Sequence, residues 1–168
     1  NAYQYFEGND GTYFSKDHDI WQLNSLPFPV NVSPVNGPKS LNFSKIAQPS
    51  LKEQSKEAGY YRLKRASAAT VSAELYALRM LCKFLHTTHE DFTDFTLFNR
   101  ALLEEYLSYL YLEAGRKKNY TSELSNLKTA LETLGKLYES EHLKTLFLPT
   151  DFSKKKLPVF TFYSDAEL

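Results

Sequence analysis

The feature that most restricts the fold of this 168-residue chain is a helical hydrophobic repeat between residues 67 and 85. Apolar side chains recur there every three or four positions, the spacing of one face of an α-helix. These residues are Val71, Leu75, Leu78, Cys82 and Leu85. A second side is also apolar, with Ala73, Ala77, Met80 and Phe84. Only a narrow strip is therefore polar, which is typical of a helix inside a bundle, and we expect a mainly α-helical fold.

Three further helices are predicted around this one. The first begins near Pro49, a residue suited to the first helical turn, and runs to about Arg65. The others run from about Phe98 to Ala114 and from Thr121 to about Glu141, each with leucines at helical spacing. With short connections between them, these segments predict a four- to five-helix bundle.

The N-terminal part is expected to be different. Aromatic residues flank an Asn-Asp-Gly turn within residues 3–15, which predicts a small β-hairpin. Four prolines and a glycine between residues 26 and 38 predict an irregular connector. We therefore expect an N-terminal extension over 1–48, a helical domain over 49–144, and a linker over 145–168 that leads to a further domain absent from this chain.

Composition limits the class of protein. Hydrophobic residues make up 42% of the chain, and 20 basic side chains balance 20 acidic ones, so neither disorder nor an overall polycationic surface is expected. No apolar run reaches the roughly 20 residues that a membrane-spanning helix needs. The single cysteine, Cys82, excludes an internal disulfide. We expect a cytoplasmic protein without a membrane partner. The closing Ser164-x-x-Glu167 resembles a capping box and predicts that the natural chain continues into another helix.

An enzyme active site is not indicated by any residue pattern in this chain. Cys82, His86 and His89 follow one another at spacings of four and three, so a small metal site is one alternative. A buried thiol on the apolar stripe is the favoured interpretation of Cys82, and the histidines suit a helix C-terminus. No Ser/His/Asp set, Gly-rich phosphate loop or inward carboxylate pair can be assembled, so we expect no catalytic residue, metal or cofactor in this chain.

Local charge is more informative than net charge. Five basic and two acidic side chains lie between Lys52 and Arg65, and Arg116 to Lys118 adds three cations. Lysines again outnumber acids between Lys144 and Lys156, whereas residues 86–113 carry one arginine and six acidic side chains. This distribution predicts a molecule with a basic side and an acidic side.

Two helices are predicted to have faces suited to DNA. On the first, Ser72, Tyr76, Arg79 and Lys83 fall within about 60° of one another. On the second, the solvent side carries Ser122, Ser125, Asn126, Thr129, Thr133 and Lys136. Short hydroxyl and amide side chains are poor helix formers, but they let a helix approach phosphates and base edges closely. The helix that carries Glu104 and Glu105 is expected to face away from DNA.

Two segments resemble a known family. Ser67–Leu85 resembles the first core helix of the DNA-binding domain that precedes the catalytic domain in tyrosine recombinases, the phage-integrase family. Asn119–Tyr138 resembles the last core helix of that domain, and Leu157-Pro158 is similar to the passage into the catalytic domain. The resemblance covers residues from about 41 to 168 and rests on helical patterning. It implies a SAM-like bundle that forms half of a clamp around the recombination site, with the catalytic residues located after residue 168.

The sequence therefore predicts the core-binding domain of a site-specific tyrosine recombinase or integrase from a mobile element. Its expected partners are double-stranded DNA and other recombinase protomers on that DNA. The expected DNA contacts are Ser72, Tyr76, Arg79, Lys83, Arg116, Lys117, Lys118, Ser122, Ser125, Asn126, Thr129, Lys136, Lys154, Lys155 and Lys156. The alternative is a helical protein–protein interaction module without DNA binding.

Overall fold

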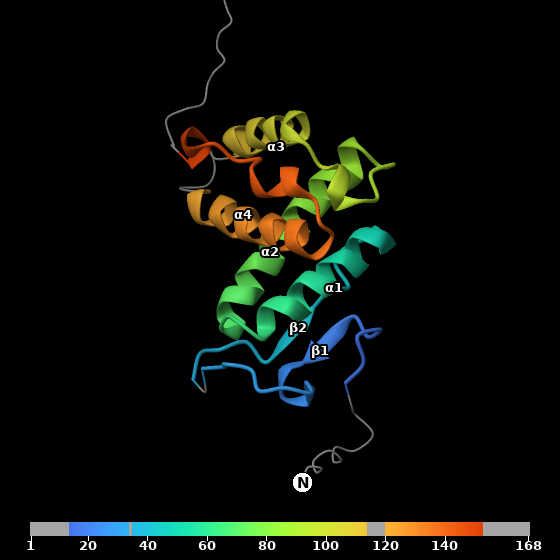
Figure 1. Cartoon of the computed structure of the whole chain (residues 1–168), viewed down its shortest axis with the longest axis vertical. Coiled ribbons are helices and arrows are strands. Elements are labelled where there is room, and N and C mark those ends of the chain that lie inside the picture. Colours follow the sequence, from blue (N-terminus) through green and yellow to red (C-terminus); the bar gives the residue numbers. More distant parts are fainter. Residues whose placement is uncertain (1–13, 34, 114–119, 153–168) are drawn as a thin grey trace, which may run out of the picture. The chain divides into compact units, whose positions relative to one another are not determined.

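A computed structural model describes residues 14–33, 35–113 and 120–152 (Figure 1). It is mainly helical with one small two-stranded antiparallel sheet toward the N-terminus, which confirms the predicted fold class. The chain divides between Thr93 and Asp94 into two compact units, which are described separately below. The first unit contains the sheet and the helices α1 and α2, and the second contains α3 and α4. The predicted domain boundaries after residues 48 and 144 stay predictions.

The sheet pairs β1 (Ile20–Gln22) with β2 (Ser40–Asn42). Trp21 lies opposite Leu41, and both side chains are buried. The predicted hairpin in residues 3–15 falls almost entirely outside the described residues, and the observed strands come from another part of the chain. The proline-rich connector is thus the loop between these two strands. Three-residue strands are too short to produce a detectable alternation of apolar and polar residues, which explains why this sheet was not predicted.

The sheet is fixed to α1 (Pro49–Leu63) by aromatic and charged contacts. The Trp21 ring of β1 lies 6.1 Å from that of Tyr60 in α1, between ring centroids, and 4.7 Å from that of Phe43, which follows β2. The Asp19 carboxylate accepts from the ammonium groups of Lys52, at 3.0 Å, and Lys56, at 3.1 Å. Lys56 is buried, and its ammonium group also donates to the Asp17 carbonyl at 3.1 Å, so this charge is both paired and hydrogen-bonded.

The helices α1 and α2 (Ala68–Thr88) confirm the first two helix predictions. Ser67 caps α2, because its hydroxyl oxygen accepts a hydrogen bond from the Thr70 backbone N–H at 3.2 Å. The apolar stripe predicted from Val71 to Leu85 is buried throughout. The strip from Ser72 to Lys83 is not the only polar part of α2, however. Glu74 is buried on another side and accepts two hydrogen bonds from the Arg62 guanidinium of α1, at 2.9 and 2.8 Å.

The second unit is built from α3 (Arg100–Glu113), α4 (Thr121–Leu137) and short 3-10 turns. The turn η2 (Phe95–Leu97) precedes α3, while η3 (Glu141–Lys144) and η4 (Pro149–Phe152) follow α4. The third helix prediction is confirmed. Leucines at helical spacing in α4 are buried, and η3 packs against this helix.

The fourth helix begins as predicted but ends at Leu137, four residues before the expected end. Glu139 has a φ of 54°, a left-handed conformation that cannot continue an α-helix. The Ser140 N–H donates to the carbonyl of Gly135 at 2.8 Å, which closes this end of the helix. Thr133 was predicted on the solvent side, and this was wrong. It is 3% exposed, and its hydroxyl donates to the Thr129 carbonyl at 3.0 Å.

The first residues of the predicted linker are attached to α3. The Arg100 guanidinium donates to both carboxylate oxygens of Asp151, at 2.7 and 2.9 Å, and to the carbonyl of Leu146 at 3.0 Å. The hydrogen bonds to Asp151 raise the pKa of the Arg100 guanidinium above its ordinary value, and Glu104 adds to this effect. Burial acts in the opposite direction but does not cancel the rise. Arg100 thus joins the segment after α4 to the start of α3.

Candidate nucleic-acid interface

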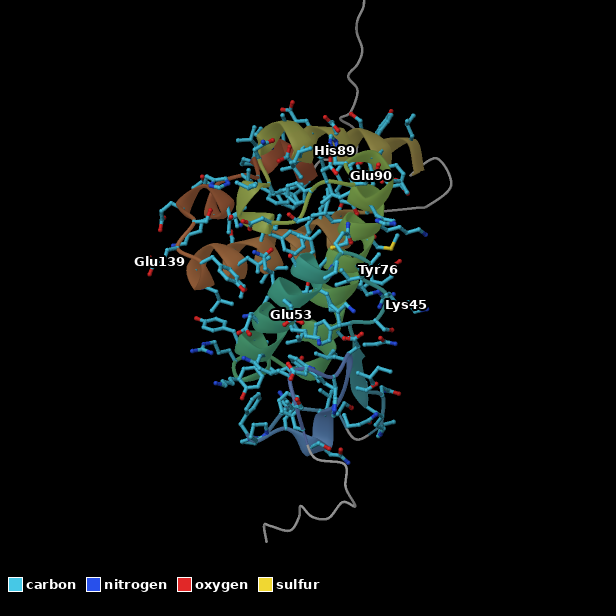
Figure 2. The ribbon with its side chains drawn as sticks, turned by 90° about the vertical axis from the view of Figure 1, so that its right-hand side faces the viewer. Lys45, Glu53, Tyr76, His89, Glu90 and Glu139 are labelled. Atoms are coloured by element: carbon cyan, nitrogen blue, oxygen red, sulfur yellow. The ribbon has the colours of Figure 1, made fainter. Side chains whose placement is uncertain are left out.

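The polar strip of α2 is the best-defined part of the predicted DNA surface. Ser72 and Arg79 are partly exposed, while Tyr76 and Lys83 are exposed. The guanidinium carbon of Arg79 lies 5.3 Å from the centroid of the Tyr76 ring, a cation–π distance that holds both side chains along the helix. The four predicted residues are therefore brought together on one helix. Figure 2 places Tyr76 and Lys45 on the same side of this unit.

Charge pairing separates these cations from those in the middle of α1. Within the described residues, neither Arg79 nor Lys83 has a carboxylate partner, and the same holds for Lys45. Much of the predicted positive charge between Lys52 and Arg65 is instead neutralised inside the unit. Lys52 and Lys56 bind Asp19, and Arg62 binds Glu74. The middle of α1 therefore carries little free positive charge, whereas Arg79 and Lys83 on α2 keep theirs.

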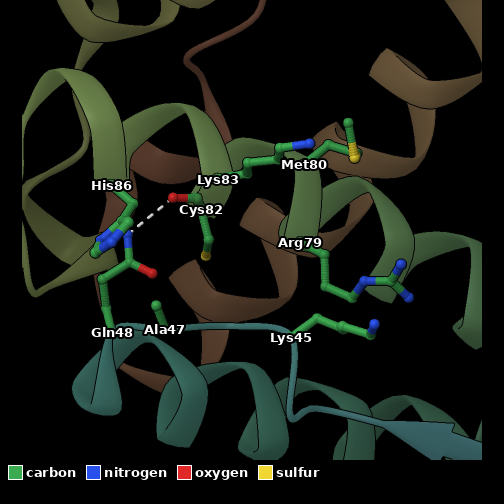
Figure 3. A pocket seen from close by; sticks show the side chains of 8 residues that line it. All are labelled: Lys45, Ala47, Gln48, Arg79, Met80, Cys82, Lys83 and His86. Carbon is green, nitrogen blue, oxygen red and sulfur yellow. Dashed lines mark hydrogen bonds between the residues drawn. The ribbon is translucent and has the colours of Figure 1, made fainter.

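A pocket of about 390 Å³ lies beside this strip (Figure 3). Its walls come from α2 and from the segment that leads into α1. It is lined by Lys45, Ala47, Gln48, Arg79, Met80, Cys82, Lys83 and His86. The Gln48 side-chain amide, which is buried, donates to the Cys82 carbonyl at 2.9 Å and so fixes the two walls together. None of these eight lining residues, all of which the structure describes, is acidic.

Two cationic or titratable lining residues were missed by sequence reasoning. Lys45 is far from α2 in sequence, and no pattern in residues 45–48 indicates that this segment packs against that helix. His86 was interpreted as a cation suited to a helix C-terminus or, in the metal-site alternative, as a ligand, and it was not included in the DNA surface. It follows Lys83 by three residues and Arg79 by seven, so the helical period did contain the signal that these side chains share a face.

The Cys82 thiol is part of the core rather than of a reactive site. Cys82 is 1% exposed, and burial raises the pKa of its thiol far above the ordinary value. A thiol that stays protonated is a poor nucleophile and a poor metal ligand. Within the described residues, no three His, Cys, Asp or Glu side chains are grouped so that they could hold a metal ion.

The predicted face of α4 is present but lies in the second unit. Ser122, Ser125 and Lys136 are exposed, and Asn126 and Thr129 are partly exposed. The Thr129 hydroxyl donates to the Ser125 carbonyl at 3.2 Å, so its hydrogen bond is made within the helix. Lys136 has no carboxylate partner in the described part of the chain. The predicted contacts Arg116, Lys117, Lys118, Lys154, Lys155 and Lys156 lie outside the described residues.

Among the described residues, no helix combines the length and apolar character needed to cross a membrane. Comparisons with family models, with curated proteins and with solved structures find no match for the chain.

Proposed function

We propose that this chain binds double-stranded DNA through the polar strip of α2, as the core-binding domain of a site-specific tyrosine recombinase. The observation that carries the proposal is the exposure of Arg79 and Lys83 without carboxylate partners in the described residues. A cation that is not neutralised by its own protein attracts phosphates and releases the counterions condensed on DNA. The recombinase assignment rests additionally on the resemblance of residues 67–85 and 119–138 to the core helices of that family.

The side chains around these cations suit a helix lying against a duplex. Ser72 supplies a hydroxyl that can donate to a phosphate oxygen, and Tyr76 supplies an exposed ring with a phenolic hydroxyl. An α-helix fits the major groove of B-DNA, so one strip along α2 can contact phosphates and base edges together. Acidic side chains, which would repel the duplex, do not occur in this strip.

The first experiment measures binding of a labelled duplex to the full chain by fluorescence anisotropy between about 50 and about 200 mM salt. Contacts to roughly six phosphates would give a log–log salt slope near −5. Binding that does not change with salt, or no binding at about 50 mM salt, contradicts the proposal.

A charge-reversed pair locates the surface. The variant Arg79→Glu with Lys83→Glu is expected to weaken duplex binding at least about tenfold, because two phosphate contacts become repulsive. The matched control is Lys39→Glu with Lys64→Glu, which changes the net charge equally at two cations of the same unit that also lack carboxylate partners in the described residues. We expect less than about a twofold effect from this control, with circular dichroism confirming that both variants are folded. Equal losses in the two variants would show that only total charge matters.

A helical protein-interaction module is the second candidate function. It is favoured by exposed leucines in the second unit, where Leu97 is 65% and Leu112 is 75% exposed. Isolated apolar residues are common on protein surfaces, so this observation is weaker than the cation pattern. Under this second function the chain would fail to bind duplex even at about 50 mM salt, and reversing the charge of Arg79 and Lys83 would leave partner binding intact.

A further inference from the structure

We infer that the pocket between α2 and the segment before α1 holds the phosphate group of a nucleotide together with its sugar. This inference deepens the proposed function by naming the chemical group bound and by adding Lys45 and Gln48 to the site. The pocket shares Arg79 and Lys83 with the α2 strip but also uses Lys45 and Gln48, and the strip could bind DNA without these two residues. The two can therefore be tested apart.

The charge of the pocket selects an anion. Lys45, Arg79 and Lys83 contribute three positive groups to its lining, and none has a carboxylate partner among the described residues. Figure 3 shows the Arg79 and Lys45 side chains extending in the same direction on one side of the pocket. An anion placed beside Arg79 and Lys45 would be attracted by both charges, which favours anion binding on this side of the pocket. A phosphate, with several oxygens that accept from guanidinium and ammonium groups at once, suits this arrangement better than a single carboxylate does.

The remaining walls indicate that the ligand is more than a bare ion. A volume of about 390 Å³ lies in the range of pockets for small organic ligands. Ala47 and Met80 add apolar surface, against which a deoxyribose ring can pack. Gln48, which is 6% exposed, is held in place by its bond to the Cys82 carbonyl, so one wall is already ordered before a ligand arrives. A nucleotide offers both the anionic group and the apolar ring that these walls require.

The test follows backbone amide resonances of the full ¹⁵N-labelled chain during titration with deoxythymidine 5′-monophosphate. Residues 45–48 and 79–86 are expected to shift in a saturable manner, while sodium acetate at the same ionic strength leaves them unchanged. Inorganic phosphate is expected to shift them more weakly than the nucleotide does, because it lacks the sugar. Equal shifts with acetate and the nucleotide, or none at these residues, would overturn the inference.

The variants separate the pocket from general charge effects. Lys45→Gln is expected to weaken nucleotide binding about fivefold, since it removes one of three cations from the lining. Lys45→Arg, which keeps the charge, should restore most of the affinity. Lys39→Gln removes another exposed, unpaired lysine of the same described unit that does not line this pocket, and it should have no effect. Equal losses in Lys45→Gln and Lys39→Gln would contradict a specific site.

The phosphate could come from a free nucleotide or from the DNA backbone. Adding a short duplex to the same samples distinguishes these two sources. Displacement of the mononucleotide by the duplex would show that the pocket takes a phosphate of the DNA backbone. Mononucleotide binding by a chain that does not bind duplex would support the pocket and contradict the proposed function. Duplex binding that leaves residues 45–48 unshifted, and that Lys45→Gln does not weaken, would overturn the pocket and leave the proposed function standing.

Discussion

Asp19 has a larger role in the first unit than its partly exposed position suggests. Its carboxylate accepts from two lysines of α1, Lys52 and Lys56, and the second of these is almost completely buried. The hydrogen bonds from Lys52 and then Lys56 lower the pKa of Asp19 below its ordinary value of 3.8, and their charges act in the same direction. Burial opposes this shift but does not overcome it. Asp19 therefore connects the sheet to α1 in its ionised form.

This lowered pKa predicts a contribution to acid stability. Because the pKa of Asp19 is lower in the folded than in the unfolded chain, its stabilising effect is complete well above pH 3.8. The effect is lost as the pH falls through the lower, folded-state value. Asp19→Asn should thus melt at a lower temperature than the parent chain near pH 7, and the difference should shrink toward about pH 2. Solvent screening keeps the difference modest, since 38% of the Asp19 side chain is exposed.

Thermal unfolding of both chains across this pH range checks the prediction. Asp17→Asn is the matched control, because its exposed side chain forms no ion pair in the described part of the chain. That control removes a carboxylate that forms no ion pair in the described part of the chain, so it should melt close to the parent chain near pH 7. If the two variants show the same dependence on pH, the ion pairs of Asp19 contribute nothing measurable.

At the level of elements, α4 shows how a contact after the helix determines where the helix ends. The turn η3 lies so close to α4 that a Cβ atom on Gly135 would be 2.8 Å from the Ser140 carbonyl oxygen. The same atom would lie 3.2 Å from the Cβ of Leu143. Glycine in a helix interior usually lowers stability by about 1 kcal/mol relative to alanine. Here it permits a close approach that any larger residue would prevent.

Gly135→Ala is therefore expected to destabilise the chain although it raises helix propensity. Displacing the backbone of η3 should cost about 1–3 kcal/mol, which exceeds the propensity gain of about 1 kcal/mol. Urea unfolding would measure a lower free energy of unfolding. Lys136→Ala, at the neighbouring exposed position, should change it by no more than about 0.5 kcal/mol. A stabilised Gly135→Ala would show that η3 moves away without cost.

How far these elements could be predicted from the sequence depends on whether their cause is local in the chain. Helix positions followed from the spacing of apolar residues, and the start of α2 followed from Ser67. The end of α4 could not be predicted, because its left-handed residue is Glu139 rather than the glycine that usually marks such a position. The α2 strip could be predicted from residue spacing, since all of its residues lie on one helix. Periodicity says nothing about which distant segment packs beside that helix, so Lys45 and Gln48 were missed.

At the scale of the whole molecule, a net charge of zero conceals an uneven distribution of free charge. Pairing inside the first unit neutralises Lys52, Lys56 and Arg62, and pairing inside the second neutralises Arg100. Cations without carboxylate partners in the described residues remain in both units, with Lys83 on α2 and Lys136 on α4. If the chain binds DNA as proposed, its affinity depends on which of these cations reach the same duplex.

The salt dependence of duplex binding measures directly how many of these cations contact the DNA. Each lysine that neutralises a phosphate contributes about 0.9 to the magnitude of the log–log salt slope. If both units contact one duplex, Lys83→Gln and Lys136→Gln should each reduce the slope by about 0.9, and the double variant by about 1.8. Anisotropy titrations of the parent chain and the three variants, at four or so salt concentrations each, would resolve such differences.

The pattern of slopes also identifies the ways in which the proposal can be wrong. A reduction confined to Lys83→Gln would place the contact on the first unit alone and remove α4 from the interface. A reduction confined to Lys136→Gln would remove α2, and with it the observation on which the proposed function rests. The slope counts released ions and does not measure affinity. A variant that merely weakens the fold would therefore lower the affinity and leave the slope unchanged. Additive losses of slope thus require that surfaces on both units engage phosphates of the same DNA.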